Sequence, residues 1–141
     1  MLTKRPFIVN ETEGGNLVAG TNKSVVVLEN WAYATSSSGQ AYLLREIRKA
    51  KVPTFAVGKI NEAMSRIEKG TARVKEFDLV KDDVYELRIS ADNRWFRVLY
   101  ALHNGTYLAL FFGAKKTNAL DRGWISTASR RLKEYRKQNP T

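Results

Sequence analysis

Residues 85–137 decide the fold and read YELRISADNRWFRVLYALHNGTYLALFFGAKKTNALDRGWISTASRRLKEYRK. In residues 85–89 apolar and charged side chains alternate, which predicts a strand with one buried face. Residues 95–102 are apolar on both faces, as expected of a strand at the centre of a sheet. The Asn104-Gly105 pair then predicts a hairpin, because both central positions of a type I′ turn need positive φ angles. The residues after this turn form the returning strand.

A basic helix follows the last of these strands. Asp121 can accept a hydrogen bond from the first turn of this helix and so cap it. The apolar residues of the helix recur at helical spacing, which predicts the face that packs on the sheet. They are Trp124, Ala128, Leu132 and Tyr135.

Two helices are predicted upstream of these strands. Apolar residues recur at helical spacing in residues 43–50 and again in residues 60–67, and Gly70 is placed to end the second helix. Helices joined this closely should pack as an antiparallel hairpin. With the strands, they predict an α+β domain in which a helical hairpin packs on a small, antiparallel-rich sheet and the basic helix comes last.

The other segments carry weaker patterns. Residues 24–29 are apolar and rich in β-branched side chains, which predicts a buried strand, and residues 73–77 predict another. Residues 1–24 are interrupted by glycines and predict an N-terminal extension or an edge hairpin. We therefore expect residues 25–141 to form a single domain, which suits a chain of 141 residues.

The charge of the chain favours a polyanionic partner. The formal net charge is +10, and a balance this basic is typical of proteins that bind nucleic acid or another anionic surface. The excess is concentrated, since residues 115–137 carry eight basic and two acidic side chains. A basic but otherwise ordinary soluble protein is the alternative.

Composition also excludes several kinds of site. The chain has no cysteine, so disulfides and thiolate zinc sites are absent. Its single histidine, His103, is expected in an exposed loop and argues against a histidine metal site or a Ser/His/Asp triad. No apolar run approaches the roughly 20 residues of a membrane span. We expect a cytoplasmic protein that needs no metal and no cofactor.

Four basic residues are candidates for a phosphate site. Arg97 lies in the middle of a strand, where a buried guanidinium needs a partner. It either pairs with a carboxylate such as Glu86 or belongs to an open surface that binds an anion. Arg88 lies one strand away, and Lys115 and Lys116 leave the end of a third strand. Neighbouring strands would bring these cations together, although solvated surface charges are the alternative for the lysines.

Further residues could contact RNA around this group. Trp95 or Tyr100 could stack on an unpaired base, with packing in the core as the alternative. These two residues point to opposite faces of their strand, so we expect at most one of them to stack. Basic residues in the turn and on the last helix could contact phosphates, or they could be solvated charges. They are Arg94, Arg122, Arg130, Lys133 and Lys137.

A site of this kind can act on RNA without a metal. The ribose 2′-OH is an internal nucleophile, so the protein has to align it, stabilise the charge of the transition state and protonate the leaving oxygen. Arginine and lysine can supply the electrostatic part. A lysine or tyrosine with a perturbed pKa could transfer the proton.

These segments resemble the RelE/ParE superfamily of toxins, and within it the HigB branch of phage-derived Gp49-like proteins. The resemblance is carried by residues 85–89, 95–100 and 111–117 and by the basic C-terminal helix. It covers about residues 25–137 of the sequence and implies a RelE-like fold.

The resemblance implies the toxin of a type II toxin–antitoxin pair, which cuts mRNA in the ribosomal A site by attack of the 2′-OH. It implies that Arg97 contacts the region of the scissile phosphate, and that Arg88, Lys115 and Lys116 complete the site. The protein partner would be a helix-turn-helix antitoxin. Some members have a tyrosine or histidine near the start of the last helix, where this chain has Trp124, which cannot transfer a proton.

Two other functions stay open. A non-catalytic protein on the same scaffold would bind the ribosome, RNA or another protein without cutting mRNA. A toxin of the sister ParE branch would act on gyrase and would also leave mRNA intact.

Overall fold

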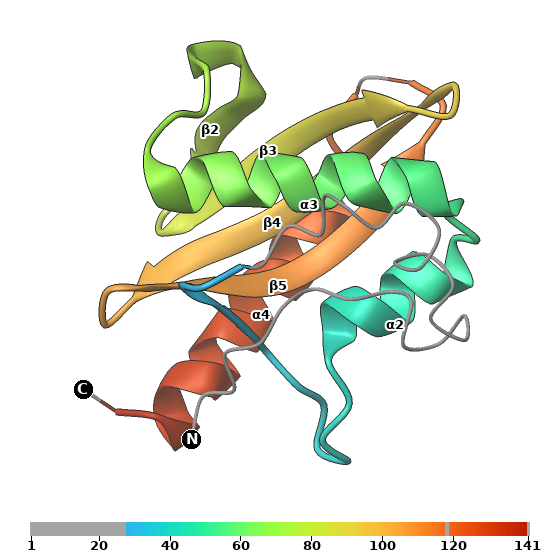
Figure 1. Ribbon diagram of the computed structural model, residues 1–141. Coiled ribbons are helices and arrows are strands. Elements are labelled where there is room, and N and C mark those ends of the chain that lie inside the picture. Colours follow the sequence, from blue (N-terminus) through green and yellow to red (C-terminus); the bar gives the residue numbers. More distant parts are fainter. Residues whose placement is uncertain (1–27, 118, 141) are drawn as a thin grey trace.

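The computed structural model describes residues 28–117 and 119–140. In this part of the chain, helices pack on both faces of a five-stranded sheet, so the fold is α+β as predicted (Figure 1). The elements in chain order are β1 (Trp31–Tyr33), α2 (Tyr42–Lys49), α3 (Thr54–Lys69), the 3₁₀ helix η2 (Val74–Glu76), β2 (Phe77–Lys81), β3 (Val84–Ala91), β4 (Arg94–His103), β5 (Thr106–Lys115) and α4 (Arg122–Gln138).

The sheet is mixed and has the strand order β1-β5-β4-β3-β2. Strands β2 to β5 follow one another as antiparallel neighbours, whereas β1 runs parallel to β5. The central position of β4 explains why its sequence is apolar on both faces. Asn104 and Gly105 have φ angles of 53° and 77°, which confirms the predicted turn between β4 and β5.

Each face of the sheet has its own core. On the face covered by α3, Trp31 and Phe96 are fully buried, and the Trp31 indole N–H donates a hydrogen bond of 2.9 Å to the Met64 carbonyl. On the face covered by α4, Leu99 and Leu108 are fully buried. We call these two sides the α3 face and the α4 face.

Helix α4 forms as the sequence predicts. The Asp121 carboxylate accepts a hydrogen bond of 2.8 Å from the Gly123 N–H and caps the helix. Ala128 and Leu132 are buried against the sheet, and the two aromatic residues of the predicted stripe pack beside them. The apolar stripe is therefore confirmed.

Strand β5 contains a one-residue bulge. Leu99 pairs with Phe111, but Tyr100 pairs with Ala109, so Leu110 is an extra residue in β5. Before the bulge the even-numbered residues of β5 face α4, and after it the odd-numbered residues do. The side chains beyond the bulge therefore point to the face opposite to the one that simple alternation would give.

A buried ion pair braces this bulge. Arg131 of α4 pairs with Glu46 of α2, with 2.8 Å between Nη2 and Oε2, and donates a hydrogen bond of 2.8 Å to the Leu110 carbonyl. Glu46 in turn accepts a hydrogen bond of 3.0 Å from the Phe112 N–H. The Arg131 guanidinium also lies 3.7 Å from the centroid of the Tyr42 ring. These contacts satisfy backbone groups on the edge of β5 beyond the short stretch that β1 covers.

One predicted strand lies mostly outside the described residues, and another is replaced for most of its length by a 3₁₀ helix. Of residues 24–29, only Leu28 and Glu29 lie within the described residues, and neither belongs to a strand, because β1 begins at Trp31. Most of residues 73–77 form η2 instead of a strand, because the Glu76 carboxylate turns back and accepts a hydrogen bond of 2.9 Å from the Arg73 N–H. Residues 1–24 lie outside the described residues, so their role as an extension stays a prediction.

The two upstream helices form, and Gly70 ends α3 in the left-handed region as predicted. However, α2 lies beside β5 while α3 lies across β3 and β4 (Figure 1), so the closely packed antiparallel hairpin is not confirmed. None of the helices in the described part of the chain is both long and apolar enough to cross a membrane.

The prediction of an exposed loop for His103 is wrong. His103 is the last residue of β4 and is buried. Its Nε2 lies 3.1 Å from the Asn139 carbonyl oxygen, and its ring meets the edge of Tyr135. The C-terminal end of α4 therefore covers this histidine, which the sequence around the turn could not reveal.

Candidate functional site

Three neighbouring strands place three of the four cations predicted for a phosphate site on the α4 face of the sheet. Arg88 on β3 is directly opposite Arg97 on β4, and Arg97 is opposite Gly113 on β5. In the next row, Trp95 is opposite Lys115. Neighbouring strands are only about 4.8 Å apart, so these side chains form one patch. We call Arg88, Trp95, Arg97 and Lys115 the cationic face.

Arg97 is buried and paired within this face. Its Nε lies 2.7 Å from Oε1 of Glu86, and the two side chains are 4% and 7% exposed. The Arg97 guanidinium also lies 5.8 Å from the centroid of the Trp95 ring. Burial lowers the pKa of Arg97, whereas the Glu86 carboxylate counteracts this and the Arg88 charge adds to the lowering. Of the two alternatives for Arg97, the structure thus shows the pair with Glu86.

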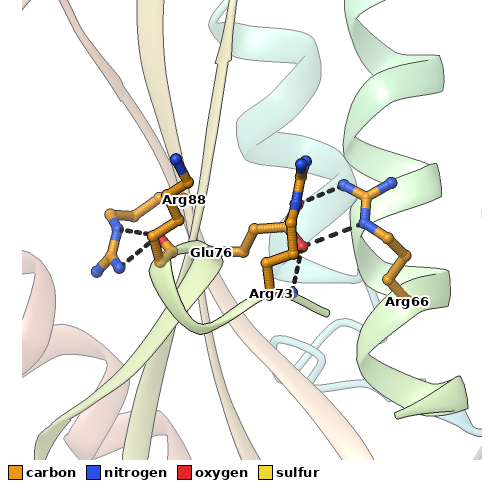
Figure 2. A network of polar contacts seen from close by, with 5 residues as sticks. Arg66, Arg73, Glu76 and Arg88 are labelled. Carbon is orange, nitrogen blue, oxygen red and sulfur yellow. Dashed lines mark hydrogen bonds and ion pairs between the residues drawn. The ribbon is translucent and has the colours of Figure 1, made fainter. Parts of the chain in front are cut away.

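Arg88 is nearer to the surface and is held by several groups. Its guanidinium donates hydrogen bonds of 2.6 and 3.2 Å to the Lys75 carbonyl in the turn before β2 (Figure 2). Its Nη1 lies 3.4 Å from the carboxylates of both Asp78 and Glu86. The Arg88 side chain is 20% exposed, so it can reach a bound anion more readily than Arg97.

The 3₁₀ helix η2, which contains Lys75 and Glu76, is itself bound to α3. Arg66 of α3 donates hydrogen bonds of 2.6 and 3.2 Å to the Glu76 carboxylate, which also lies 3.8 Å from Arg73 Nη2 (Figure 2). The hydrogen bond from Arg66 is the main cause that lowers the pKa of Glu76. This network fixes the backbone carbonyl on which Arg88 rests.

Lys115 lies at the edge of the cationic face. Its Nζ is 3.6 Å from the Asp121 carboxylate and 5.2 Å from the centroid of the Trp124 ring, and the side chain is 31% exposed. The Trp124 ring packs on Gly113, where an added Cβ would lie 2.6 Å from the ring. Gly113 therefore lets the start of α4 approach β5 closely. Lys116 follows the end of β5 and is exposed.

The structure places Trp95 and Arg94 on opposite faces of the sheet. Trp95 is half-buried on the cationic face, beside Arg97. Arg94 instead donates a hydrogen bond of 3.0 Å to the Ala50 carbonyl and lies over the Phe96 ring on the α3 face. The cationic face therefore does not include Arg94.

The remaining predicted RNA-binding residues lie along α4 and not on the sheet. Arg122 is exposed at the start of the helix, and Arg130 is exposed in its middle. Lys133 and Lys137 line a hollow of about 520 Å³ whose other wall includes Asp82 and Asp83. Lys133 and Lys137 therefore lie beside acidic residues near the C-terminal end of α4, whereas Lys115 lies at the start of this helix.

A second hollow, of about 290 Å³, lies on the α3 face beyond the end of α3. Its lining includes Tyr85, Tyr100 and Tyr107 and no charged residue among those described. Burial raises the pKa of Tyr100, and its two tyrosine neighbours add to this effect. Because Tyr100 lines this hollow, it lies on the α3 face, on the opposite side of the sheet from the cationic face.

Sequence reasoning missed three parts of this site. It did not foresee that Asp121, besides capping α4, lies beside Lys115, or that the Lys75 carbonyl holds Arg88. It also missed the contact between Gly113 and Trp124, although a glycine inside a strand is a signal for a close approach.

The arrangement can bind phosphate groups without a metal. Arg88, Lys115 and Lys116 offer exposed or partly exposed donors, and Arg97 lies beneath them with its charge balanced by Glu86. Among the described residues, no group of three or more metal-ligating side chains occurs. The partly exposed Trp95 adds an aromatic surface beside these cations.

A comparison with known protein families shows to which family the chain belongs. The sequence model of the phage-derived protein Gp49-like family (DUF891) matches residues 45–133, more than half of the chain. The chain belongs to this family. The Gp49-like proteins are a family of RelE/HigB-type toxins, so the resemblance noted in the sequence is confirmed. The matched range runs from α2 into α4 and includes the whole cationic face. No curated protein matches the chain.

Proposed function

We propose that this Gp49-like protein is the toxin of a type II toxin–antitoxin pair and that it cleaves mRNA in the ribosomal A site. The observation that carries the proposal is the cationic face itself. Three strands within the part of the chain that matches the family bring Arg88, Arg97 and Lys115 onto one surface. A basic surface of this kind, next to a half-buried tryptophan, suits an RNA strand with unstacked bases.

The proposed reaction is attack of a ribose 2′-OH on the adjacent phosphorus. A bond forms between the 2′ oxygen and phosphorus as the hydroxyl gives up its proton to water. The bond from phosphorus to the 5′ oxygen of the next nucleotide breaks, and the leaving oxygen takes up a proton from water. Arg88, Lys115 and Lys116 would contact the phosphate and stabilise its growing charge. Arg97, which is paired with Glu86 beneath the surface, would help to hold the site around the scissile phosphate.

The proposed partners are mRNA on the ribosome and a helix-turn-helix antitoxin, in the cytoplasm. A chain with a net charge of +10 attracts RNA at long range. An antitoxin that covers the cationic face would block access of the RNA to it.

Induced expression tests this proposal. Wild-type protein should arrest growth and produce new mRNA 5′ ends, and Lys115→Gln/Lys116→Gln should relieve both effects. The matched control is Lys59→Gln/Lys69→Gln, which removes the same charge from exposed positions of α3. Arrest that is lost equally in both variants would show that only net charge matters.

A non-catalytic RNA- or ribosome-binding protein is the second candidate. The observation that favours it is Trp124, which lies beside Lys115 and cannot transfer a proton. This candidate predicts arrested translation with intact mRNA. Intact mRNA together with altered DNA supercoiling would indicate the gyrase-directed mode of the ParE branch.

A further inference from the structure

Glu86 contacts both arginines of the cationic face. Its Oε1 lies 2.7 Å from Arg97 Nε, and its Oε2 lies 3.4 Å from Arg88 Nη1. The Glu86 side chain is 7% exposed, so it cannot itself reach a bound RNA. It lies below the surface, between two guanidinium groups that come from neighbouring strands.

Two positive charges on directly opposite residues of neighbouring strands need a negatively charged partner. Arg88 and Arg97 are directly opposite each other in the sheet, a placement that is unfavourable for like charges. Asp78 also contacts Arg88, at 3.4 Å, but its side chain is 68% exposed. Glu86, in contrast, is buried and contacts both arginines.

We infer that Glu86 is a positioning residue of the proposed RNA site, holding the Arg88 and Arg97 guanidinium groups together at the floor of the cationic face. The inference rests on the proposed function for its RNA readout only. Without the carboxylate, mutual repulsion would drive the two guanidinium groups apart, and Arg97 would leave its place beneath Arg88 and Lys115.

This inference predicts that the RNA affinity of Glu86→Gln changes in the direction opposite to the one expected from net charge alone. Glu86→Gln removes one negative charge, so electrostatic attraction alone would make RNA bind more tightly. Loss of positioning should instead weaken binding of a single-stranded oligoribonucleotide by about tenfold. Asp78→Asn is the control, because it makes the same charge change on the exposed side of Arg88. It should bind RNA as the wild type does or up to about threefold more tightly.

A second measurement does not depend on RNA. The Arg97 Nε–H of the wild type, next to a buried carboxylate, should give a distinct and slowly exchanging signal in ¹H–¹⁵N NMR spectra. Glu86→Gln should abolish or strongly shift this signal, and Glu86→Asp should partly restore both the signal and the affinity. If Glu86→Gln does not fold, the neutral pair Glu86→Gln/Arg97→Gln replaces it, and this pair should bind RNA no better than Arg97→Gln alone.

The outcomes separate the two proposals. An unchanged Arg97 signal in Glu86→Gln, or RNA binding at least as tight as in Asp78→Asn, would overturn the role of Glu86. A wild-type protein that gives the expected NMR response but binds no RNA would overturn the proposed function and leave the positioning role intact.

Discussion

At the scale of single residues, the two arginines of β4 show how strand geometry assigns different roles to the same side chain. Arg94 and Arg97 are three positions apart, so they point to opposite faces of the sheet. Arg94 holds the end of α2 through the Ala50 carbonyl, whereas Arg97 lies on the cationic face. The sequence offered both as RNA contacts, and the face of the strand separates them.

Gly113 should be the least tolerant glycine of the site. Gly113→Ala would place a Cβ 2.6 Å from the Trp124 ring, so the start of α4 has to move. We expect the free energy of unfolding to fall by about 1–3 kcal/mol, measured by urea denaturation, with a shift in tryptophan fluorescence. Gly58→Ala is the control, because nothing lies within 4 Å of its Cβ position in α3. It should stabilise the protein by up to about 1 kcal/mol.

At the scale of elements, the parts with strong local patterns were predicted and the parts held by distant contacts were not. The Asn104-Gly105 turn, the central strand and the cap at Asp121 each depend on neighbours in sequence, and all three are confirmed. The 3₁₀ helix η2 depends on Glu76, whose main partner lies on α3. Burial of His103 likewise depends on the far end of α4. Local periodicity carries no information about such contacts.

The same limit applies to the candidate site. The convergence of Arg88, Arg97 and Lys115 could be predicted, because it follows from strand order and alternation once the hairpins are known. Pairing of Arg97 with Glu86 could only be offered as one of two alternatives. Deciding between them required the side-chain positions on two neighbouring strands.

The brace between α2 and α4 should be worth more than a surface ion pair. Arg131→Met would leave Glu46, which is 16% exposed, without its main partner. We expect the free energy of unfolding to fall by about 3–5 kcal/mol in urea denaturation. The control is Arg136→Met, which removes an exposed ion pair with Asp83 and should cost about 1 kcal/mol or less. Equal losses in the two variants would contradict a structural role for the brace.

The anchor between α3 and η2 should make stability depend on pH. The folded pKa of Glu76 lies below its ordinary value of 4.5. The ionised carboxylate therefore stabilises the fold fully above pH 4.5, and this contribution is lost as the pH falls through the lowered folded pKa. Glu76→Gln should lower stability at neutral pH and flatten its decline in acid, followed by urea denaturation at a series of pH values. An acid decline as steep as in the wild type would refute this assignment.

At the scale of the whole molecule, the two sides of the sheet have different chemistry. The four residues of the cationic face lie on the α4 side of the sheet, and the hollow lined by three tyrosines lies on the α3 side. A chain of net charge +10 attracts any polyanion. The partly exposed cations beside Trp95 lie on one side of the sheet, and this is the place where we propose that RNA binds.

RNA binding should therefore be strongly dependent on salt. The logarithm of the association constant should fall linearly with the logarithm of salt concentration, with a slope of about −0.7 for each phosphate contacted in a single strand. Lys115→Gln/Lys116→Gln should make this slope shallower by about 1.4 if each lysine contacts one phosphate, measured by fluorescence anisotropy with a labelled oligoribonucleotide. A parallel line, displaced but of equal slope, would show that these lysines make no direct phosphate contact.

The bulge at Leu110 determines which face of the sheet each later residue of β5 occupies. If Leu110 were paired in the sheet and not bulged, simple alternation would continue through it, and every later residue of β5 would turn to the other face. Lys115 and Gly113 would then lie on the tyrosine side of the sheet, and Ala114 would meet α4 in their place. The composition of the molecule would not change, yet the cationic face would lose a lysine and α4 would lose the glycine on which Trp124 packs. Deleting Leu110 would instead remove the bulge and leave these residues on their present face, so the two-against-one pairing, and not the number of residues, sets the orientation of the site.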